Sequence, residues 1–259
     1  MRPRAASIHH FPDSEEAGAA EGGVRMKRLQ TALALTALMA LGAAVAGAAT
    51  VSTTPCILPD NGTGTVTLPP AGCSYLSPNQ VHMIIDGLPP GTTIILAPIH
   101  RDFICRQSTG TGPCNLPGGP LGGEVENFNS TAVFQLSGTG ALSGWNRTVT
   151  VPLGVQVASG KRTLGAPTQT FPTNMELIQG SIPSGDPDFA AFDVVGGTAN
   201  GFSSPGSTTL TRQSNGSFQV NSQFNVGYSI HFIGASGGKL AGYEGTTEGT
   251  VNMAVTGNK

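Results

Sequence analysis

The stretch Ser217–Ile233 reads SFQVNSQFNVGYSIHFI, and its large apolar side chains fall on alternate positions. Phe218, Val220 and Phe224 begin one series, while Gln, Asn, Ser and His fill most of the positions between. Because successive side chains of a β-strand point to opposite faces, the pattern predicts a strand with one buried and one wet face. An Asn-Gly pair at 215–216, just before it, favours a tight hairpin turn.

The chain on both sides of this stretch has the same character, with turn residues recurring at short intervals and no sustained helical period. The sequence therefore predicts an all-β fold, either an antiparallel sandwich or a barrel of about ten strands. The expected strands are Thr65–Leu68, Gln80–Asp86, Thr92–Arg106, Glu124–Ser137, Ala141–Val157, Thr168–Gln179, Asp188–Val195, Ser207–Gln213, Ser217–Ile233 and Leu240–Val255.

The composition excludes two broad classes of protein. Only 11% of the 259 residues are charged, against about 25% in ordinary domains. The net charge is −2, so there is no excess of Lys and Arg to neutralise phosphates, and we expect no nucleic-acid partner. Hydrophobic residues make up 38% of the chain, enough to build a core, which excludes a wholly disordered protein despite its 37 glycines.

The N-terminal region has the features of an export signal. Lys27 and Arg28 follow Met26 and precede an apolar run, which ends in the Ala-Gly-Ala of residues 46–48. This arrangement predicts a signal peptide at 26–48, with residues 1–25 a non-native or disordered extension. A secreted protein with no stable membrane anchor after signal removal is expected. The alternative is a transmembrane anchor at 29–49, which is long enough to span a bilayer.

All four cysteines lie after the expected cleavage point, in agreement with export. Pairing of sequence neighbours predicts the disulfides Cys56–Cys73 and Cys105–Cys114, the first closing an N-terminal segment at 49–79. A zinc site is the alternative, but no C-x-x-C spacing occurs. We therefore expect no metal and no other cofactor.

Two parts of the β domain at 80–259 resemble each other. IDGLPPG at 85–91 returns as IQGSIPSG at 178–185, and the order Phe, Gly, Leu, Gly, aromatic recurs further on, ending at Trp145 and at Tyr243. The pattern suggests duplicated halves at 80–160 and 174–255, related by a pseudo-twofold axis. Coincidence is the alternative, because Gly and Pro recur in any loop-rich chain.

Turn motifs also give the chain a likeness to other sequences. Residues Gly87–Thr93 read GLPPGTT, and Leu240–Gly242 (LAG) precedes Gly245–Thr250 (GTTEGT). With these motifs the chain from Val81 to Val255 resembles a set of uncharacterised secreted bacterial all-β proteins. The resemblance covers most of the chain after the signal but implies no known activity.

The strongest candidate for catalysis is the pair His100 and Asp102. Two residues apart on one strand, they are expected on the same side, where they could share a proton or a metal ion. The alternative is a pair on an exposed surface. His231 lies on the polar parity of its strand and is expected to face solvent.

Other candidate catalytic residues rest on short patterns. Ser236 matches both G-x-S-x-G and S-x-x-K, but a strand rather than a helix is expected after it, which favours an ordinary hairpin turn. The pairs Asp186 with Asp188 and Glu124 with Glu126 offer carboxylates for Ca²⁺ or for glycoside hydrolysis. The alternative is that the first pair are turn residues and the second the charged start of a strand.

Trp145 and Tyr243 are candidate ligand-binding aromatics. Both follow a Leu-x-Gly pattern at equivalent places in the suspected repeat, so the alternative is that each packs into the same structural corner.

Three functions remain open at this point. The first is an exported, non-catalytic cell-surface or extracellular module for binding or structure. The second is a β-barrel that binds a small apolar ligand inside. The third is a secreted enzyme using His100 and Asp102. The partner is not identified by the sequence, although the uncharged stretch Ser217–Ile233 suggests self-association through its polar face or its edge.

Overall fold

The computed structural model describes residues 54–77, 82–106 and 114–257. Its described part is all-β, as expected, with twelve strands in one antiparallel sheet and two single turns of 3₁₀ helix, η1 (Gly140–Leu142) and η2 (Thr198–Asn200). The strands are β1 (Cys56–Leu58), β2 (Cys73–Leu76), β3 (His82–Ile84), β4 (Ile94–Cys105), β5 (Asn115–Pro117), β6 (Gly122–Gly138), β7 (Asn146–Gly160), β8 (Thr168–Ser181), β9 (Phe189–Gly196), β10 (Pro205–Arg212), β11 (Phe218–Gly234) and β12 (Glu244–Gly257).

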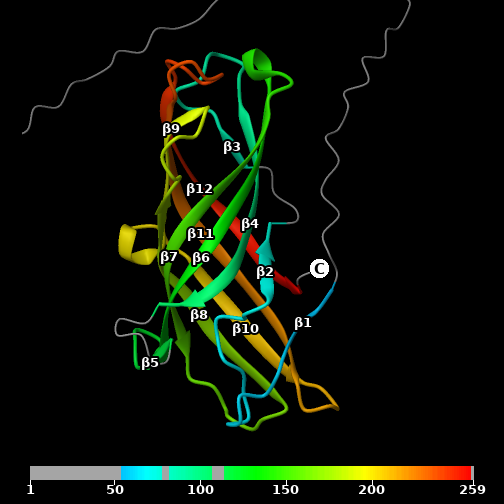
Figure 1. Ribbon diagram of the computed structural model, residues 1–259. Helices are drawn as coiled ribbons and strands as arrows, with labels where there is room; N and C mark the ends of the chain where they lie inside the picture. The colour runs from blue at the N-terminus through cyan, green and yellow to red at the C-terminus, as the bar shows by residue number, and fades with distance from the viewer. Residues whose placement is uncertain (1–53, 78–81, 107–113, 258–259) are drawn as a thin grey trace, which may run out of the picture. The chain divides into compact units, whose positions relative to one another are not determined.

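Eight of these strands close into a ring (Figure 1). Its order is β2, β4, β6, β7, β8, β10, β11 and β12, and β12 pairs with β2 to complete it. Every neighbouring pair is antiparallel. The sheet therefore has no free edge around the ring, which makes the structure barrel-like.

Towards one end of the ring, β9 and β3 join the wall. There β9 takes the place of β10 and pairs with both β8 and β11. On the other side of the ring β3 pairs with the first residues of β4. We call this end, where the loops at 138–146 and 234–244 lie, the hairpin end; it is uppermost in Figure 1.

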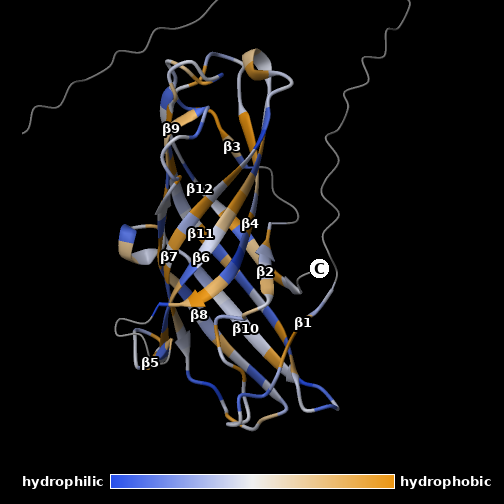
Figure 2. Ribbon diagram, in the orientation of Figure 1, coloured by the Kyte–Doolittle hydropathy of each residue, from blue (hydrophilic) through white to orange (hydrophobic). Residues whose placement is uncertain are grey.

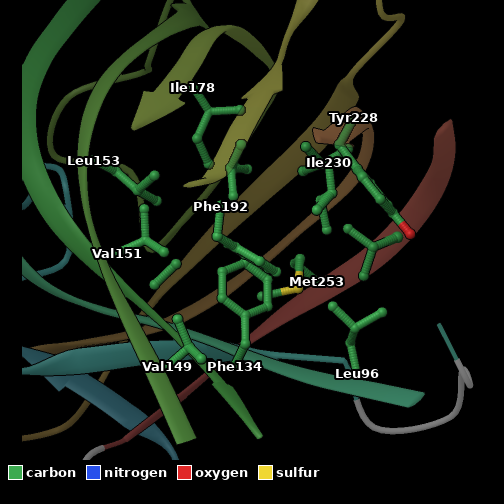
Figure 3. Packing of buried hydrophobic residues seen from close by; sticks show 14 of the residues in the cluster. Leu96, Phe134, Val149, Val151, Leu153, Ile178, Phe192, Tyr228, Ile230 and Met253 are labelled. Atoms are coloured by element: carbon green, nitrogen blue, oxygen red, sulfur yellow. The ribbon is translucent and has the colours of Figure 1, made fainter. Parts of the chain in front are cut away.

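The interior is filled by alternate residues of the long strands. In β11 the positions from Phe218 to Val226 alternate strictly between buried and exposed, which confirms the pattern expected for this stretch. Figure 2 shows the same alternation of hydrophobic and hydrophilic residues along the strands. Figure 3 shows side chains from several strands, among them Phe134, Phe192 and Met253, pointing toward one another inside the ring.

The β6–β7 and β11–β12 loops have the same backbone hydrogen bonds. Gly138 N–H donates to the Trp145 carbonyl and Gly234 N–H to the Tyr243 carbonyl, both at 2.8 Å. In each loop the glycine lies against a buried leucine, where a Cβ atom would collide with the leucine backbone. The expected repeat requires this likeness, and the duplication itself stays a prediction.

The N-terminal part of the β fold differs from the expectation. Thr65–Leu68, expected as a strand, has no strand structure, while the short strands β1, β2 and β5 were not expected. Val66 and Leu68 are buried by packing against Phe171 and Leu210 instead of by sheet pairing. The alternation of Val66 and Leu68 therefore indicates burial but not a strand. The two prolines that follow have no N–H group to donate to a neighbouring strand.

Both expected disulfides are present. Cys56–Cys73 joins β1 to β2 with its Cα atoms 5.7 Å apart, and Cys105–Cys114 joins the end of β4 to the start of β5. The expected extension at 1–25 and signal peptide at 26–48 lie outside the described residues. In the part of the chain that is described, no helix has the length and apolar character needed to cross a membrane.

Candidate functional site

An internal cavity of about 90 Å³ lies within the ring. All of its lining residues are buried except Pro98 and Ile99, which are half-buried. Most of the lining is apolar, including the side chains labelled in Figure 3 as Leu96, Leu153, Ile178, Ile230 and Met253. Because one water needs only about 10–15 Å³ of such space, the cavity has room for a small organic molecule.

Residues 60–70, which we call the N-terminal plug, form part of one end of this cavity. Thr65 donates to the buried Gln169 amide oxygen at 2.9 Å, and Arg162 donates to the Val66 carbonyl at 2.8 Å. These bonds hold the plug against the β7–β8 side of the ring. Leu68 and the two prolines after it then line the cavity.

The hairpin end is closed by aromatic packing. Phe189 packs edge to face on both Phe192 and Phe232, and the exposed fractions of these side chains are 1%, 0% and 0%. None of the three lines the cavity. The cavity thus lies between this aromatic cluster and the plug.

Asp186 and Asp188 stabilise the hairpin end as turn residues. Asp186 accepts hydrogen bonds from the backbone N–H groups of Asp188 and Phe189, at 2.9 and 3.0 Å. Asp188 accepts from Trp145 Nε1 and Arg147 Nη1, both at 3.2 Å. The carboxylates are therefore engaged with a cation and with N–H donors, which explains their place in the turn without a bound Ca²⁺.

A chain of three hydroxyl groups crosses one wall of the cavity. The Tyr75 hydroxyl donates to Ser222 Oγ at 3.0 Å, and Ser222 Oγ lies 2.8 Å from Thr208 Oγ1. All three residues line the cavity. Ser222 lies on the buried face of β11, where it is a small polar residue in an otherwise apolar series. This break in the pattern could have indicated a polar group in the interior, but the sequence analysis did not use it.

Two further polar groups in the lining have an oxygen atom without a hydrogen-bond partner. Glu126 and Thr173 are 3% and 4% exposed, and Glu126 Oε1 and Thr173 Oγ1 have no partner among the described residues. Burial raises the pKa of Glu126 to about 8; the positive charge of Arg162 opposes this rise, and the negative charge of Glu124 adds to it. At neutral pH the Glu126 carboxyl is therefore mainly uncharged.

Only part of the interpretation of Glu124 and Glu126 as a charged strand start was right. Glu124 pairs with Arg162 and is half-buried, whereas Glu126 faces the interior in the same series as Phe128 and Phe134. The inward parity of β6 sets this orientation, because Glu126 is two residues from Phe128.

Two histidines also line the cavity. His100 is buried, its Nε2 lies 2.6 Å from Ser130 Oγ, and its ring meets that of Phe103 edge to face. Burial lowers the pKa of His100 to about 4, so the imidazole is neutral at pH 7. His82 Nδ1 lies 3.5 Å from the Tyr228 hydroxyl, and burial lowers the pKa of His82 as well.

The expectation that His100 and Asp102 share one side of a strand is wrong. The β4–β6 register shifts between Arg101 and Ile104, and Asp102 takes a positive φ of 58°. This bulge turns Asp102 outward, where its side chain is 53% exposed and pairs with Arg101, while His100 faces inward. The alternative of an exposed surface pair fails too, because His100 is buried.

The other candidates lie outside the cavity. Ser236 is exposed in the turn after β11, and β12 rather than a helix follows it. Trp145 and Tyr243 are partly buried against the core at the hairpin end, which supports the packing role. His231 lies half-exposed on the outer face, with Nδ1 3.4 Å from Asp193 and Nε2 3.6 Å from Glu244.

The polar face of Ser217–Ile233 lies on the outside of the ring, with Gln219, Asn221, Gln223 and Asn225 exposed. Both backbone edges of β11 are occupied, by β9 and β10 on one side and by β1 and β12 on the other. Pairing of this strand with a second chain through its edge is therefore blocked.

Within the described ranges, no group of three or more His, Cys, Asp or Glu side chains is placed to hold a metal ion. Comparison of the chain with family models, with curated proteins and with solved structures gives no match. The geometry of the cavity is therefore the main guide to function.

Proposed function

We propose that this protein is an exported, non-catalytic binding protein that holds a small, largely apolar molecule inside its ring of strands. The observation that carries the proposal is the internal cavity of about 90 Å³, with its mainly apolar lining. A packed β structure without a ligand leaves few voids larger than a water molecule. Ligand sites, in contrast, are apolar hollows with a few placed polar groups, as here.

Export is supported by the signal-like sequence at 26–48 and by the two disulfides. Disulfides persist in oxidising compartments such as the periplasm and the extracellular space. Intact-mass measurement of the exported protein is expected to show a mature N-terminus near Ala49. Recovery of the full chain in a membrane fraction would contradict this.

The direct test is whether benzene and indole bind to the disulfide-bonded full chain. Calorimetric titration and thermal unfolding measure this binding. A ligand that binds only the folded state raises the unfolding temperature. We expect both probes to do so at millimolar concentration. If neither binds, the proposal is wrong.

A matched pair of variants shows where the probes bind. Ala132 lines the cavity, whereas Ala97, on β4, is exposed on the outer face. Ala132→Phe fills the space and is expected to abolish probe binding, while Ala97→Phe leaves it unchanged. Equal effects of the two variants would place the probes elsewhere.

A further inference from the structure

The cavity contains two buried oxygen atoms that no group in the described part of the chain satisfies. Glu126 Oε1 and Thr173 Oγ1 have no hydrogen-bond partner, although both side chains line the cavity and are more than nine-tenths buried. Buried polar atoms in folded proteins are nearly always paired, so such atoms call for an explanation. Two of them in the lining of one cavity point to a partner inside it.

These two residues lie two strands apart, in neighbouring rows of the cavity wall. Thr173 of β8 is directly opposite Ser159 of β7 in the sheet, and Ser159 is opposite Glu124 of β6, two residues from Glu126. Ser159 itself is fully buried and does not line the cavity. Glu126 and Thr173 therefore lie on the same side of the cavity, each with hydrogen-bonding capacity left over.

The charges nearby disfavour an ionic ligand head. Arg162, the cation beside Glu126, is already occupied by Glu124, by Thr65 and by the Val66 carbonyl, so a ligand carboxylate finds no free cation. No Lys or Arg is among the residues that line the cavity. Burial raises the pKa of Glu126 to about 8, so at neutral pH it offers no full negative charge to a ligand ammonium group.

We infer that the ligand has one uncharged hydroxyl group on its apolar body, which donates to Glu126 Oε1 and accepts from the Thr173 hydroxyl. A hydroxyl group both donates and accepts, so a single group satisfies both atoms. The inference rests on the proposed function, and it names the chemical class of the ligand: a small apolar alcohol or phenol.

Toluene and phenol are a suitable pair of probes, because they have nearly the same size and differ by a methyl against a hydroxyl group. The full chain at neutral pH is titrated with each probe by calorimetry. We expect phenol to bind tighter than toluene by roughly tenfold, because the two hydrogen bonds of its hydroxyl group outweigh the hydrophobic contribution of the toluene methyl group. An apolar cavity that makes no hydrogen bonds to its ligand would instead bind toluene tighter, because toluene is the more hydrophobic of the two probes.

The variants separate the hydroxyl effect from a change in packing. Thr173→Val and Glu126→Leu are expected to remove the preference for phenol, while toluene binding persists. Thr173→Ser keeps the hydroxyl and is expected to keep the preference. Thr247→Val is the matched control, because Thr247 Oγ1 is also buried and unpartnered but Thr247 does not line the cavity.

Each result decides one of the two claims. If both probes bind wild type without a preference for phenol, or if Thr173→Val and Thr247→Val leave equal preferences, the inferred hydroxyl site is wrong and the apolar cavity site stands. If neither probe binds, the proposed function fails and the inference with it. Where Thr173→Val does not fold, Glu126→Leu against Thr247→Val gives the same decision.

Discussion

The hairpin end and the cavity region of the ring have differently filled interiors. At the hairpin end the inward positions carry Phe189, Phe192 and Phe232, which meet edge to face and leave no cavity lining among them. In the cavity region the inward positions carry Thr208 and Ser222 beside aromatic residues such as Phe128 and Phe224. The number of strands fixes the width of a barrel, and side-chain volume then decides whether it is filled.

The two regions therefore contribute differently: the hairpin end stabilises the fold, and the cavity region provides the space for binding. Large apolar side chains stabilise the hairpin end by burial and by close packing. In the cavity region, small polar side chains such as Thr208 and Ser222 interrupt the aromatic packing, and they leave space and polar atoms that a ligand needs. The variants below test this difference, beginning with the largest effect.

The first prediction compares two phenylalanines on β11. Phe232 is fully buried in the aromatic cluster at the hairpin end, while Phe224 lines the cavity. Phe232→Ala is expected to lower the free energy of unfolding by about 3–5 kcal/mol, and Phe224→Ala by less, because part of its side chain already lacks packing partners. Urea unfolding of both variants measures the difference. Equal losses would show that the cavity region is packed as densely as the hairpin end.

The second prediction concerns the pH dependence of stability. The pKa of Glu126 rises from an ordinary 4.5 to about 8 on folding, so the folded protein holds a proton there that the unfolded chain releases between these values. Stability is therefore lost as pH rises, by at most about 1.4 kcal/mol per pH unit. Glu126→Gln is expected to remove this loss, which urea unfolding at a series of pH values measures.

The pH window must be chosen with His100 in mind. Its pKa falls from 6.5 to about 4 on folding, so it contributes the opposite slope, a loss of stability as pH falls below 6.5. Between pH 6.5 and pH 8 only the Glu126 contribution remains of the two. An identical pH profile of wild type and Glu126→Gln in this window would mean that Glu126 is ionised in the folded protein.

The third prediction compares the two hairpin loops. Trp145 Nε1 donates to Asp188 at 3.2 Å, whereas no side-chain hydrogen bond of Tyr243 is found in the described part of the chain. Trp145→Phe is expected to cost about 1 kcal/mol for the lost bond, and Tyr243→Phe less. Thermal unfolding in parallel measures both. A larger loss for Tyr243→Phe would show that the second loop depends on its hydroxyl group.

The fourth and smallest effect is expected on the outer face. Asn221 is exposed on β11, and both edges of that strand are paired. Asn221→Lys is therefore expected to change stability by no more than about 0.5 kcal/mol and to leave the sedimentation coefficient unchanged. If wild type sediments as a dimer and the variant as a monomer, the protein self-associates through its polar face.

Local periodicity predicted the long strands well, because alternation records which side of a strand is buried. It predicted Ser217–Ile233 almost to its ends and most of the strand starts after residue 80. It failed at Thr65–Leu68, where the alternating side chains are buried without sheet pairing. The short strands β1, β2 and β5 have too few residues to show a period.

The site was harder to predict than the fold, because it depends on closure of the ring. The sequence indicated His100 as a site residue. A bulge that no sequence pattern predicts turns its expected partner Asp102 outward. Glu126 and Thr173 come together only through the pairing of three strands. Their parity indicated an inward position, but their lack of partners is a property of the assembled interior.

Closure of the ring also has a consequence for folding. The wall is completed by β2, near the start of the described chain, pairing with β12 at its end (Figure 1). Contacts between such distant segments form slowly, since a long loop must be closed before they give any stabilisation. Until β12 is in place, β2 and β11 present unpaired edges, which are sites for aggregation. A chain that lacks its last strand should therefore accumulate as aggregates rather than as a smaller folded protein.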